Sequence, residues 1–311
     1  MDRKRWKDES HERAVEEFYS TGVEHYGDFH GGYLNFGLWE SGNEDYQRAA
    51  ENLVRRIGTM LGLDGRSHVL DVAPGMGPQD VLLYREFAQP RIDGLDATWK
   101  HVERCRRRAL EHGIGRDVVF HHGSAVSLPF DDASFSHVMS IEGPEHFDTR
   151  DRFFSEAYRV LEPGGVMALA DYTLPRPVRG PLDWIAIDLV RRIWKVPRAN
   201  LWTTEEYRQR LAARGFSRVE VTEVGENVIP GYYREQRRKE VRRELARIRG
   251  FVGGRLGQFI DHALIWAYRR GLVEYVLVRA EKVCLFAGGG ERTNIRSPEV
   301  KLSRRGAWKA V

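Results

Sequence analysis

Cysteine is scarce in this sequence: Cys105 and Cys284 are the only two among 311 residues. Two cysteines cannot build a disulfide framework or a cysteine-based metal cluster. Their scarcity is also typical of proteins from a reducing compartment. We therefore expect a cytoplasmic protein whose chemistry requires no metal.

Long apolar runs are absent as well. No stretch approaches the ~18 consecutive apolar residues that a membrane helix needs. The beginning of the sequence, MDRKRWKDESHERAVEEFY, is charged and lacks the apolar segment of a secretory signal. These two absences predict a chain with no membrane partner and no export signal.

The net charge is small, +4, and it is unevenly distributed. Residues 231–255 carry +6 and residues 282–311 carry +5, which leaves −7 for the rest of the chain. The positive charge therefore belongs to one helical stretch and one terminal segment, while the body is mildly acidic. Because nucleic-acid binding depends on neutralising phosphates with Lys and Arg, we expect no nucleic-acid partner.

Between Ser67 and Asp171, short apolar runs rich in β-branched residues alternate with helical stretches. Strands are predicted at Val69–Val72, Ile92–Leu95, Val118–His121, His137–Ser140 and Val166–Ala170, and two more at Ser217–Val224 and Leu272–Ala280. Helices are predicted at Pro78–Phe87, Trp99–His112, Arg150–Leu161, Pro181–Trp194 and Thr203–Phe216. This alternation predicts an α/β fold with a doubly wound, mostly parallel sheet of seven strands, covered by helices on both faces.

The composition divides the chain into four parts. Residues 1–60 form an N-terminal helical and aromatic cap, and residues 61–175 form the core that contains the first five strands. Residues 176–281 supply helices and the last two strands. Residues 282–311 show no periodicity, so we expect a flexible tail.

The segment HVLDVAPGMGPQD, from His68 to Asp80, consists of an apolar strand, a tight glycine-containing loop and the start of a helix. Glycine lets the backbone approach a ligand closely, and a helix N-terminus presents free N–H groups. At the end of the next strand comes Asp96, whose carboxylate can accept two hydrogen bonds from a ribose diol. Together these features predict a site for a nucleoside-bearing cofactor.

Two further segments carry a resemblance to a known family. LPFDDASFSHVMS (Leu128 to Ser140) and RVLEPGGVMALADY (Arg159 to Tyr172) resemble the fourth- and fifth-strand regions of class I S-adenosylmethionine-dependent methyltransferases. The resemblance covers Tyr19 to Lys282 and is strongest to small-molecule members, including sugar O-methyltransferases and sterol-type C-methyltransferases. It implies a Rossmann-like core with a helical lid inserted after strands 5 and 6, and S-adenosylmethionine as the cofactor.

The same resemblance assigns the cofactor contacts to Asp71, Ala73, Gly75, Gly77, Asp96, Ala97, Ser124 and Ala125. The first four follow the first strand, Asp96 would hold the ribose hydroxyls, and Ser124 and Ala125 would meet the adenine. The chain departs from the family at two positions. Ala73 replaces a glycine, which is tolerable if its φ is negative, and Ser124 replaces an acid but can still form a hydrogen bond.

Three residues at strand ends are candidate catalytic groups. His146 follows the fourth strand, and a histidine at neutral pH can accept a proton from a hydroxyl. Asp171, at the end of the fifth strand, would be its partnering acid, as in similar sugar O-methyltransferases. Glu142 lies where C-methyltransferases carry an acid that steadies a carbocation. Each of the three has a structural hydrogen-bonding role as its alternative.

Acceptor contacts are predicted in the aromatic segment between the first two helices, at Tyr26, Tyr33, Asn35 and Trp39. The aromatic rings would exclude water and stack on the acceptor, and the amide would offer one polar contact. Packing of the first helices onto the sheet is the equal alternative. Arginines between 234 and 249 are candidates for an anionic group on the acceptor, against a solvated helix face.

These features predict an enzyme that transfers a methyl group from S-adenosylmethionine to oxygen or nitrogen of a small molecule in secondary metabolism. Four alternatives stay open: a C-methyltransferase acting through Glu142 on an isoprenoid, a nicotinamide-dependent oxidoreductase, a nucleic-acid methyltransferase, and a cofactor-binding module without catalysis. Whether the chain forms a homo-oligomer is also open.

Overall fold

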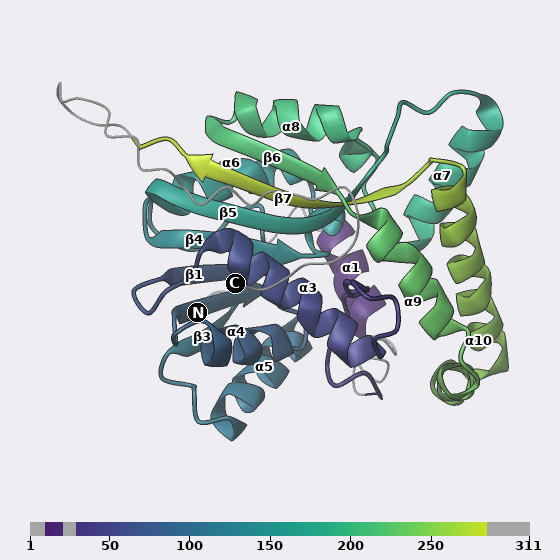
Figure 1. Cartoon of the computed structure of the whole chain (residues 1–311), viewed down its shortest axis with the longest axis horizontal. Helices are drawn as coiled ribbons and strands as arrows, with labels where there is room; N and C mark the ends of the chain where they lie inside the picture. The colour runs from purple at the N-terminus through teal and green to yellow at the C-terminus, as the bar shows by residue number, and fades with distance from the viewer. Residues whose placement is uncertain (1–9, 21–28, 285–311) are drawn as a thin grey trace.

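The computed structural model describes residues 10–20 and 29–284. Their centre is one seven-stranded sheet with the strand order β3-β2-β1-β4-β5-β7-β6 (Figure 1). The strands are β1 (His68–Val72), β2 (Arg91–Asp96), β3 (Val118–His122), β4 (Phe135–Ile141), β5 (Leu161–Thr173), β6 (Phe216–Glu223) and β7 (Glu274–Lys282).

The first five strands are parallel, and β7 is antiparallel to both of its neighbours, β5 and β6. The chain first builds outward from β1 through β2 to β3, then returns to place β4 on the other side of β1. The strand order therefore reverses between β1 and β4. In open α/β sheets, ligands bind outside the carboxyl ends of the strands at such a reversal.

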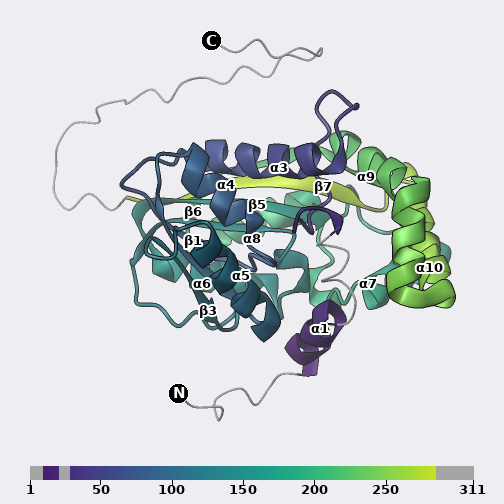
Figure 2. The same cartoon turned by 90° about the horizontal axis from the view of Figure 1, so that it is seen from below.

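Helices cover both faces of the sheet, as Figure 2 shows from below. One core contains α3 (Tyr46–Leu61), α4 (Pro78–Glu86) and α5 (Trp99–Glu111), and the other contains α6 (Arg150–Val160) and α8 (Thr204–Ala213). Neighbouring strand residues alternate between them: Val69 packs in the first core and Leu70 in the second. The period of two that defines a strand thus places apolar side chains on both faces.

Local sequence signals fix several helix boundaries. Asp45 caps α3 by accepting a hydrogen bond from the Arg48 N–H at 2.8 Å. Thr203 and Glu206 form a reciprocal capping box at the start of α8. Side-chain caps of this kind satisfy backbone N–H groups that have no partner within the helix.

The described part of the chain has four further helices. The helix α1 (Ser10–Ser20) lies near the carboxyl ends of the strands, and α7 (Pro181–Ile193) follows β5. The helices α9 (Ile229–Gln236) and α10 (Lys239–Arg269) lie between β6 and β7 in the sequence, and α10 is kinked at Gly250. Short 3-10 turns occur at Pro144–His146, Arg198–Asn200 and Gly225–Asn227.

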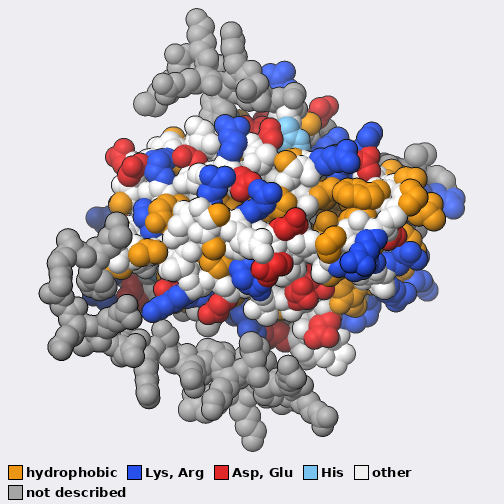
Figure 3. All heavy atoms as spheres, turned by 90° about the horizontal axis from the view of Figure 1, so that it is seen from above, with side chains coloured by type: hydrophobic (Ala, Val, Ile, Leu, Met, Phe, Trp, Pro, Cys, Tyr) orange, Lys and Arg blue, Asp and Glu red, His pale blue; other side chains and the backbone are white. Residues whose placement is uncertain are grey.

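The space-filling view in Figure 3 shows apolar side chains gathered with arginines at the end of the molecule formed by α7 and α10. The apolar side chains are those of Leu182, Trp184, Ile185 and Leu189 from α7 and Phe259 and Trp266 from α10, all at least 40% exposed. Two of the indoles have arginines over them: Arg198 over Trp184 and Arg270 over Trp266.

The predicted fold class is confirmed: an α/β fold with a mostly parallel seven-stranded sheet. All seven predicted strands are present, with bounds that differ by up to five residues from the expected ones. The function of α7, α9 and α10 as a lid and the division of the chain into four parts stay predictions. Tyr26 and residues 285–311, most of the expected tail, lie outside the described residues. Within the described ranges, no helix has the length and apolar character needed to cross a membrane.

Candidate functional site

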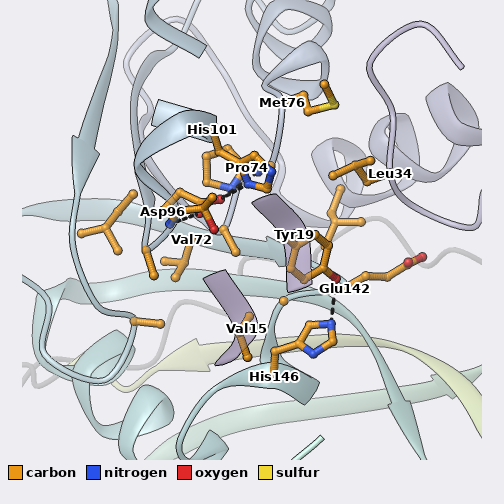
Figure 4. Close-up of a pocket in the computed structure, with 18 of the residues that line it drawn as sticks. Val15, Tyr19, Leu34, Val72, Pro74, Met76, Asp96, His101, Glu142 and His146 are labelled. Atoms are coloured by element: carbon orange, nitrogen blue, oxygen red, sulfur yellow. Dashed lines mark hydrogen bonds and ion pairs between the residues drawn. The ribbon is translucent and has the colours of Figure 1, made fainter. Parts of the chain in front are cut away.

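A cavity opens at the carboxyl ends of β1, β2 and β4, at the reversal of strand order, and we call it the first cavity. It contains about 940 Å³ of empty space, open solvent at its mouth included. Residues from α1, the aromatic segment and the loops after four strands line it. Figure 4 shows Asp96 and His101 on one side and Glu142 and His146 on the other, with Tyr19 between them.

The loop after β1 forms one wall of the first cavity with its backbone. Ala73, Pro74, Gly75 and Met76 all line the cavity. Gly75 has a φ of 59°, and Ala73 has a φ of 66°. The condition set for Ala73, a negative φ, is therefore not met: alanine adopts the left-handed conformation that glycine takes more easily. The Ala73 N–H donates to the Leu95 carbonyl at 2.8 Å.

Gly77 was predicted to contact the cofactor, but it does not line the first cavity. It begins α4 with a φ of 76°. A Cβ at this position would lie 2.9 Å from the Cys105 sulfur on α5. Glycine is thus required here by the turn and by helix packing.

Asp96 lies where the spacing predicted, at the end of β2 and in the wall of the first cavity. Its Oδ1 accepts from the Thr98 N–H at 2.7 Å, and its Oδ2 accepts from the Gly75 N–H at 3.2 Å. The His101 ring nitrogen Nδ1 is 3.4 Å from Oδ2. These contacts hold the carboxylate in one orientation beside the glycine loop. Ala97 and Ala125 line the same cavity, as predicted.

Asp71 does not line the first cavity; it is fully buried beside Asp80. Gln79, which does line the cavity, donates a hydrogen bond from Nε2 to Asp71 Oδ2 at 3.1 Å. Burial raises the pKa of Asp71 to about 7, and burial together with the charge of Asp71 raises the pKa of Asp80 well above its usual range. The two carboxyl groups thus favour sharing a proton, with at most one negative charge between them near pH 7.

The helix α1 closes part of the first cavity with Glu12, Val15 and Tyr19, none of which sequence reasoning identified. Glu12 accepts a hydrogen bond from the Ser124 hydroxyl. Ser124 is buried and does not itself line the cavity, whereas Glu12 does. An acid from a distant segment thus lies beside position 124.

His146 and Tyr19 form a hydrogen-bonded pair in the wall of the first cavity, with 2.8 Å between the Tyr19 hydroxyl and His146 Nε2 (Figure 4). Burial lowers the pKa of His146 to about 4 and raises the pKa of Tyr19 well above its usual range. The imidazole is therefore neutral at pH 7, and the phenol keeps its proton. A neutral imidazole can accept a proton.

Glu142 lines the first cavity next to this pair. Its Oε1 accepts two hydrogen bonds of 2.7 Å, from the Phe36 N–H and from the Tyr275 hydroxyl. Burial raises the pKa of Glu142 to about 8. Its φ is 54°, an uncommon conformation for a residue other than glycine. Glu142 is thus a mainly protonated acid at pH 7, held by the backbone of the aromatic segment.

Asp171 is not the partner of His146. It is fully buried, and its Oδ1 lies 2.7 Å from Arg150 Nη2, while its Oδ2 accepts from the Tyr207 hydroxyl at 2.8 Å. Asp171 does not line the first cavity, so the predicted pairing was wrong. The acid nearest to the imidazole is Glu145, whose Oε1 is 3.8 Å from His146 Nε2.

The aromatic segment contributes less to the first cavity than predicted. Asn35 lines it, but Tyr33 and Trp39 are 4% exposed and pack in the core beside α3, which is the alternative the sequence left open. The Trp39 indole donates from Nε1 to the Phe36 carbonyl at 3.0 Å. Tyr26 lies outside the described residues.

The arginines at 234–249 do not line a described cavity. Arg234 donates to the Gly42 carbonyl at 2.7 Å, and Arg247 pairs with Glu244 on its own helix. The side chain of Arg249 lies outside the described part of the structure. The described arginines of this stretch therefore fit the solvated helix face better than an anion site.

A second cavity, of about 780 Å³ including its open mouth, lies between α7, α10 and the end of β5. It is lined mostly by apolar side chains, among them Leu174, Ile187, Val190, Leu264 and Leu272. The two cavities meet at a common wall: Asn35 and His146 line the first, and their sequence neighbours Phe36 and Glu145 line the second. Sequence reasoning did not identify this cavity, because its walls come from helices and loops that lie far apart in the sequence.

Comparison with known proteins agrees with this geometry. Residues 69–165 match a family described as a methyltransferase domain. The chain is 33% identical over 204 residues to erythromycin 3''-O-methyltransferase of Saccharopolyspora erythraea, covering 64% of this chain and 66% of that protein. It is 30% identical over 214 residues to 27-O-demethylrifamycin SV methyltransferase of Amycolatopsis mediterranei, covering 68% of this chain and 77% of that protein.

Solved structures share the fold. The [4+2]-cyclase SpnF superposes with a TM-score of 0.70 at 22% identity, covering 88% of this chain and 97% of that chain. Geranyl diphosphate C-methyltransferase from Streptomyces coelicolor A3(2) superposes with a TM-score of 0.70 at 18% identity, covering 88% and 98%. At these identities the likeness is one of fold.

Proposed function

The chain belongs to the class I S-adenosylmethionine-dependent methyltransferases, and we propose that it methylates a hydroxyl group of a small natural product. The observation that carries this proposal is the position of the His146 imidazole in the wall of the first cavity, hydrogen-bonded to Tyr19 at 2.8 Å. A hydroxyl is a weak nucleophile while it keeps its proton, so oxygen methylation benefits from a general base. The O-methyltransferases among the relatives support the choice of oxygen.

The first cavity suits a cationic nucleoside cofactor. Asp96 offers an oriented carboxylate for the ribose hydroxyls, and the loop at Gly75 presents backbone without an obstructing side chain. Glu12, held by Ser124, is a candidate for the adenine amino edge. When bound, S-adenosylmethionine supplies an electrophilic methyl group.

The chain's own residues then supply position and a base. His146 accepts the proton of the acceptor hydroxyl as the new bond to oxygen forms. Tyr19, which keeps its proton, orients the imidazole through the 2.8 Å hydrogen bond. The helix α1 also excludes water from the reacting groups, since three of its side chains line the first cavity.

The C-methyltransferase alternative is less well supported. A carboxylate that steadies a carbocation must be ionised, whereas the pKa of Glu142 is raised to about 8. Both hydrogen bonds to its Oε1 also connect it to the aromatic segment and to β7. We assign Glu142 the role of fixing this wall of the first cavity.

The test is a methylation assay with the full chain, S-adenosylmethionine and a panel of glycosylated and unglycosylated polyketides that carry free hydroxyl groups. We expect a methyl ether, identified by mass and NMR, and a turnover that falls by about 10²–10⁴-fold in His146→Asn. The affinity of this variant for S-adenosylhomocysteine should stay near wild type. Methylation at nitrogen or carbon, or full turnover in His146→Asn, would contradict the proposal.

A further inference from the structure

Four residues that line the apolar second cavity have a buried polar atom without a protein partner. One is Arg150, whose Nε is unpaired although its guanidinium forms an ion pair with Asp171. The three others are Glu145 with Oε2, Tyr172 with its hydroxyl and Trp194 with Nε1. Glu145 as a whole is 6% exposed. Buried polar atoms in native proteins are nearly always hydrogen-bonded, because an unpaired one costs about 1–3 kcal/mol. Three such atoms in one apolar cavity point to a ligand that supplies their partners.

All three atoms are suited to donate. The Trp194 indole nitrogen is a donor only, and the Tyr172 hydroxyl carries a proton to donate. Burial and the nearby charges of Asp171 and Glu142 raise the pKa of Glu145 well above its usual range, which favours the form of this carboxyl that carries a proton to donate. A ligand that satisfies these groups must present oxygen or nitrogen acceptors.

The charges of the second cavity are already balanced. Among the described residues that line it, Arg150 is paired with Asp171 and Arg191 with Asp188. An anionic ligand such as a phosphate would need an arginine that is free to bind it. A cationic ligand would need an ionised carboxylate, whereas the raised pKa of Glu145 favours its neutral form. The cavity therefore fits a molecule without charge in the part that it encloses.

The position of the second cavity connects it to the reaction. Glu145 and His146 are consecutive residues of one 3-10 turn, and they line the second and the first cavity respectively. Phe36 lies at the common wall: its ring stacks on Tyr232 at 3.7 Å and its N–H donates to Glu142 at 2.7 Å. A molecule held by Glu145 thus lies beside the wall that carries the base.

We propose that the second cavity binds the acceptor, that this acceptor is a neutral molecule with an apolar skeleton bearing oxygen atoms, and that Glu145, Tyr172 and Trp194 hold those oxygens. The inference rests on the proposed function for the methyl transfer, but the binding site itself does not require turnover. It assigns the acceptor to the surface between α7 and α10 and excludes phosphorylated and quaternary ammonium acceptors.

Three probes with one alkyl chain test the charge preference: n-octyl β-D-glucoside, n-octyl phosphate and n-octyltrimethylammonium. Binding to the full chain is measured by titration calorimetry below the critical micelle concentrations, with S-adenosylhomocysteine present. We expect the glucoside to bind at least about 10-fold more tightly than either ionic probe. Equal or tighter binding of an ionic probe, or no binding of the glucoside, would overturn the inference.

Variants test the three donors. Glu145→Leu, Tyr172→Phe and Trp194→Phe should each weaken glucoside binding by about 3- to 10-fold, the range for one lost hydrogen bond. Glu145→Gln, which keeps a donor, should retain most of the affinity. Two matched controls, Tyr84→Phe and Trp184→Phe, change a tyrosine and a tryptophan that do not line this cavity and should leave binding unchanged.

Affinity for S-adenosylhomocysteine, measured without the probe, separates a local effect from misfolding. It should be unchanged in the three donor variants. If the glucoside were bound as expected while no hydroxyl acceptor is methylated, the proposed function would fail and the binding site would stand. If methylation occurs but the donor variants bind the glucoside and use the acceptor with unchanged KM, the binding site is refuted.

Discussion

Two groups of buried polar residues lie close together in this molecule and differ in how completely they are paired. In the first group, Arg150, Asp171 and Tyr207 bind one another: both carboxylate oxygens of Asp171 accept hydrogen bonds, and Arg150 Nε is the one side-chain polar atom of these three residues without a partner. In the second group, Glu145 lacks a partner for Oε2, and Ala73 and Glu142 have positive φ angles. Nearly complete pairing serves stability, whereas unpaired groups and unusual backbone conformations mark positions kept ready for ligands.

The largest effect on stability should follow from breaking the paired group. Arg150→Met leaves Asp171 buried with a charge and without its cation, which costs about 3–5 kcal/mol of unfolding free energy. Urea denaturation followed by circular dichroism measures this loss. The matched control is Arg208→Met on α8, which removes a half-exposed pair with Glu205 and should change stability by at most about 0.5 kcal/mol.

A loss for Arg150→Met no larger than that of the control would remove the distinction between the two groups. Replacing both partners, in Arg150→Met with Asp171→Leu, sharpens the test. The double variant should be more stable than Arg150→Met alone, because no unpaired charge stays buried.

The second prediction concerns the protonation of His146. Its pKa is lowered by burial from its ordinary 6.5 to about 4 in the folded protein. Between these values the unfolded chain binds the additional proton, so stability falls as the pH is lowered from 6.5 to 4. The loss from this residue amounts to about 3 kcal/mol.

The contribution of His146 is obtained by difference, since other groups titrate in the same range. Unfolding free energies of wild type and His146→Gln are measured at pH 7 and near pH 4.5. The variant should lose less stability than wild type on acidification. An equal loss would show that the imidazole titrates normally and is more accessible than its 6% exposure indicates.

The third prediction distinguishes two acids on one strand. Asp96→Asn removes the charge beside the glycine loop and should weaken binding of S-adenosylhomocysteine by about 10- to 100-fold, the value of a charge-assisted hydrogen bond. Its control, Asp93→Asn, lies three residues earlier on β2, where the carboxylate contacts His68 and His121 and not the first cavity. Calorimetry should find the affinity unchanged in the control.

If both variants weakened binding of S-adenosylhomocysteine equally, lining the first cavity would not be what separates the role of Asp96 from that of Asp93. In stability, the order of the two variants should be reversed: Asp93→Asn should lose more unfolding free energy than Asp96→Asn. The two histidines hold the pKa of Asp93 well below its usual range, so removing this charge lowers the unfolding free energy at neutral pH.

The sequence predicted the first cavity better than the second because strand ends are fixed by local pattern. Gly75, Asp96, Glu142 and His146 follow strands whose apolar runs are unmistakable, and parallel strands bring their carboxyl ends together. The walls of the second cavity come from helices and loops that lie far apart in the sequence, and no periodicity relates Leu174 to its neighbours there.

Contacts between distant segments explain the residues that sequence reasoning missed or misplaced. Glu12 meets Ser124 across 112 positions, and Tyr19 meets His146 across 127. For Asp171 a signal was present in the strand itself. Side chains alternate between the two faces of β5, so Asp171 lies on the same face as Leu169. Leu169 packs in the core with α6 and α8, away from the first cavity.

The smallest effect tests the strained backbone at Ala73. In Ala73→Gly, the loss of the strained left-handed alanine stabilises the folded state by about 1–2 kcal/mol. The greater flexibility of glycine stabilises the unfolded chain by about 0.4–1 kcal/mol and so opposes this gain. We expect a net stabilisation of about 0.5–1 kcal/mol in urea unfolding.

Ala133→Gly is the matched control, since Ala133 has a φ of 51° in an exposed turn and lines neither cavity. Both variants should gain stability, but only Ala73→Gly should alter affinity for S-adenosylhomocysteine, because only Ala73 lines the first cavity. A destabilised Ala73→Gly would show that the alanine methyl group contributes more by packing near Gly143 than its backbone conformation costs.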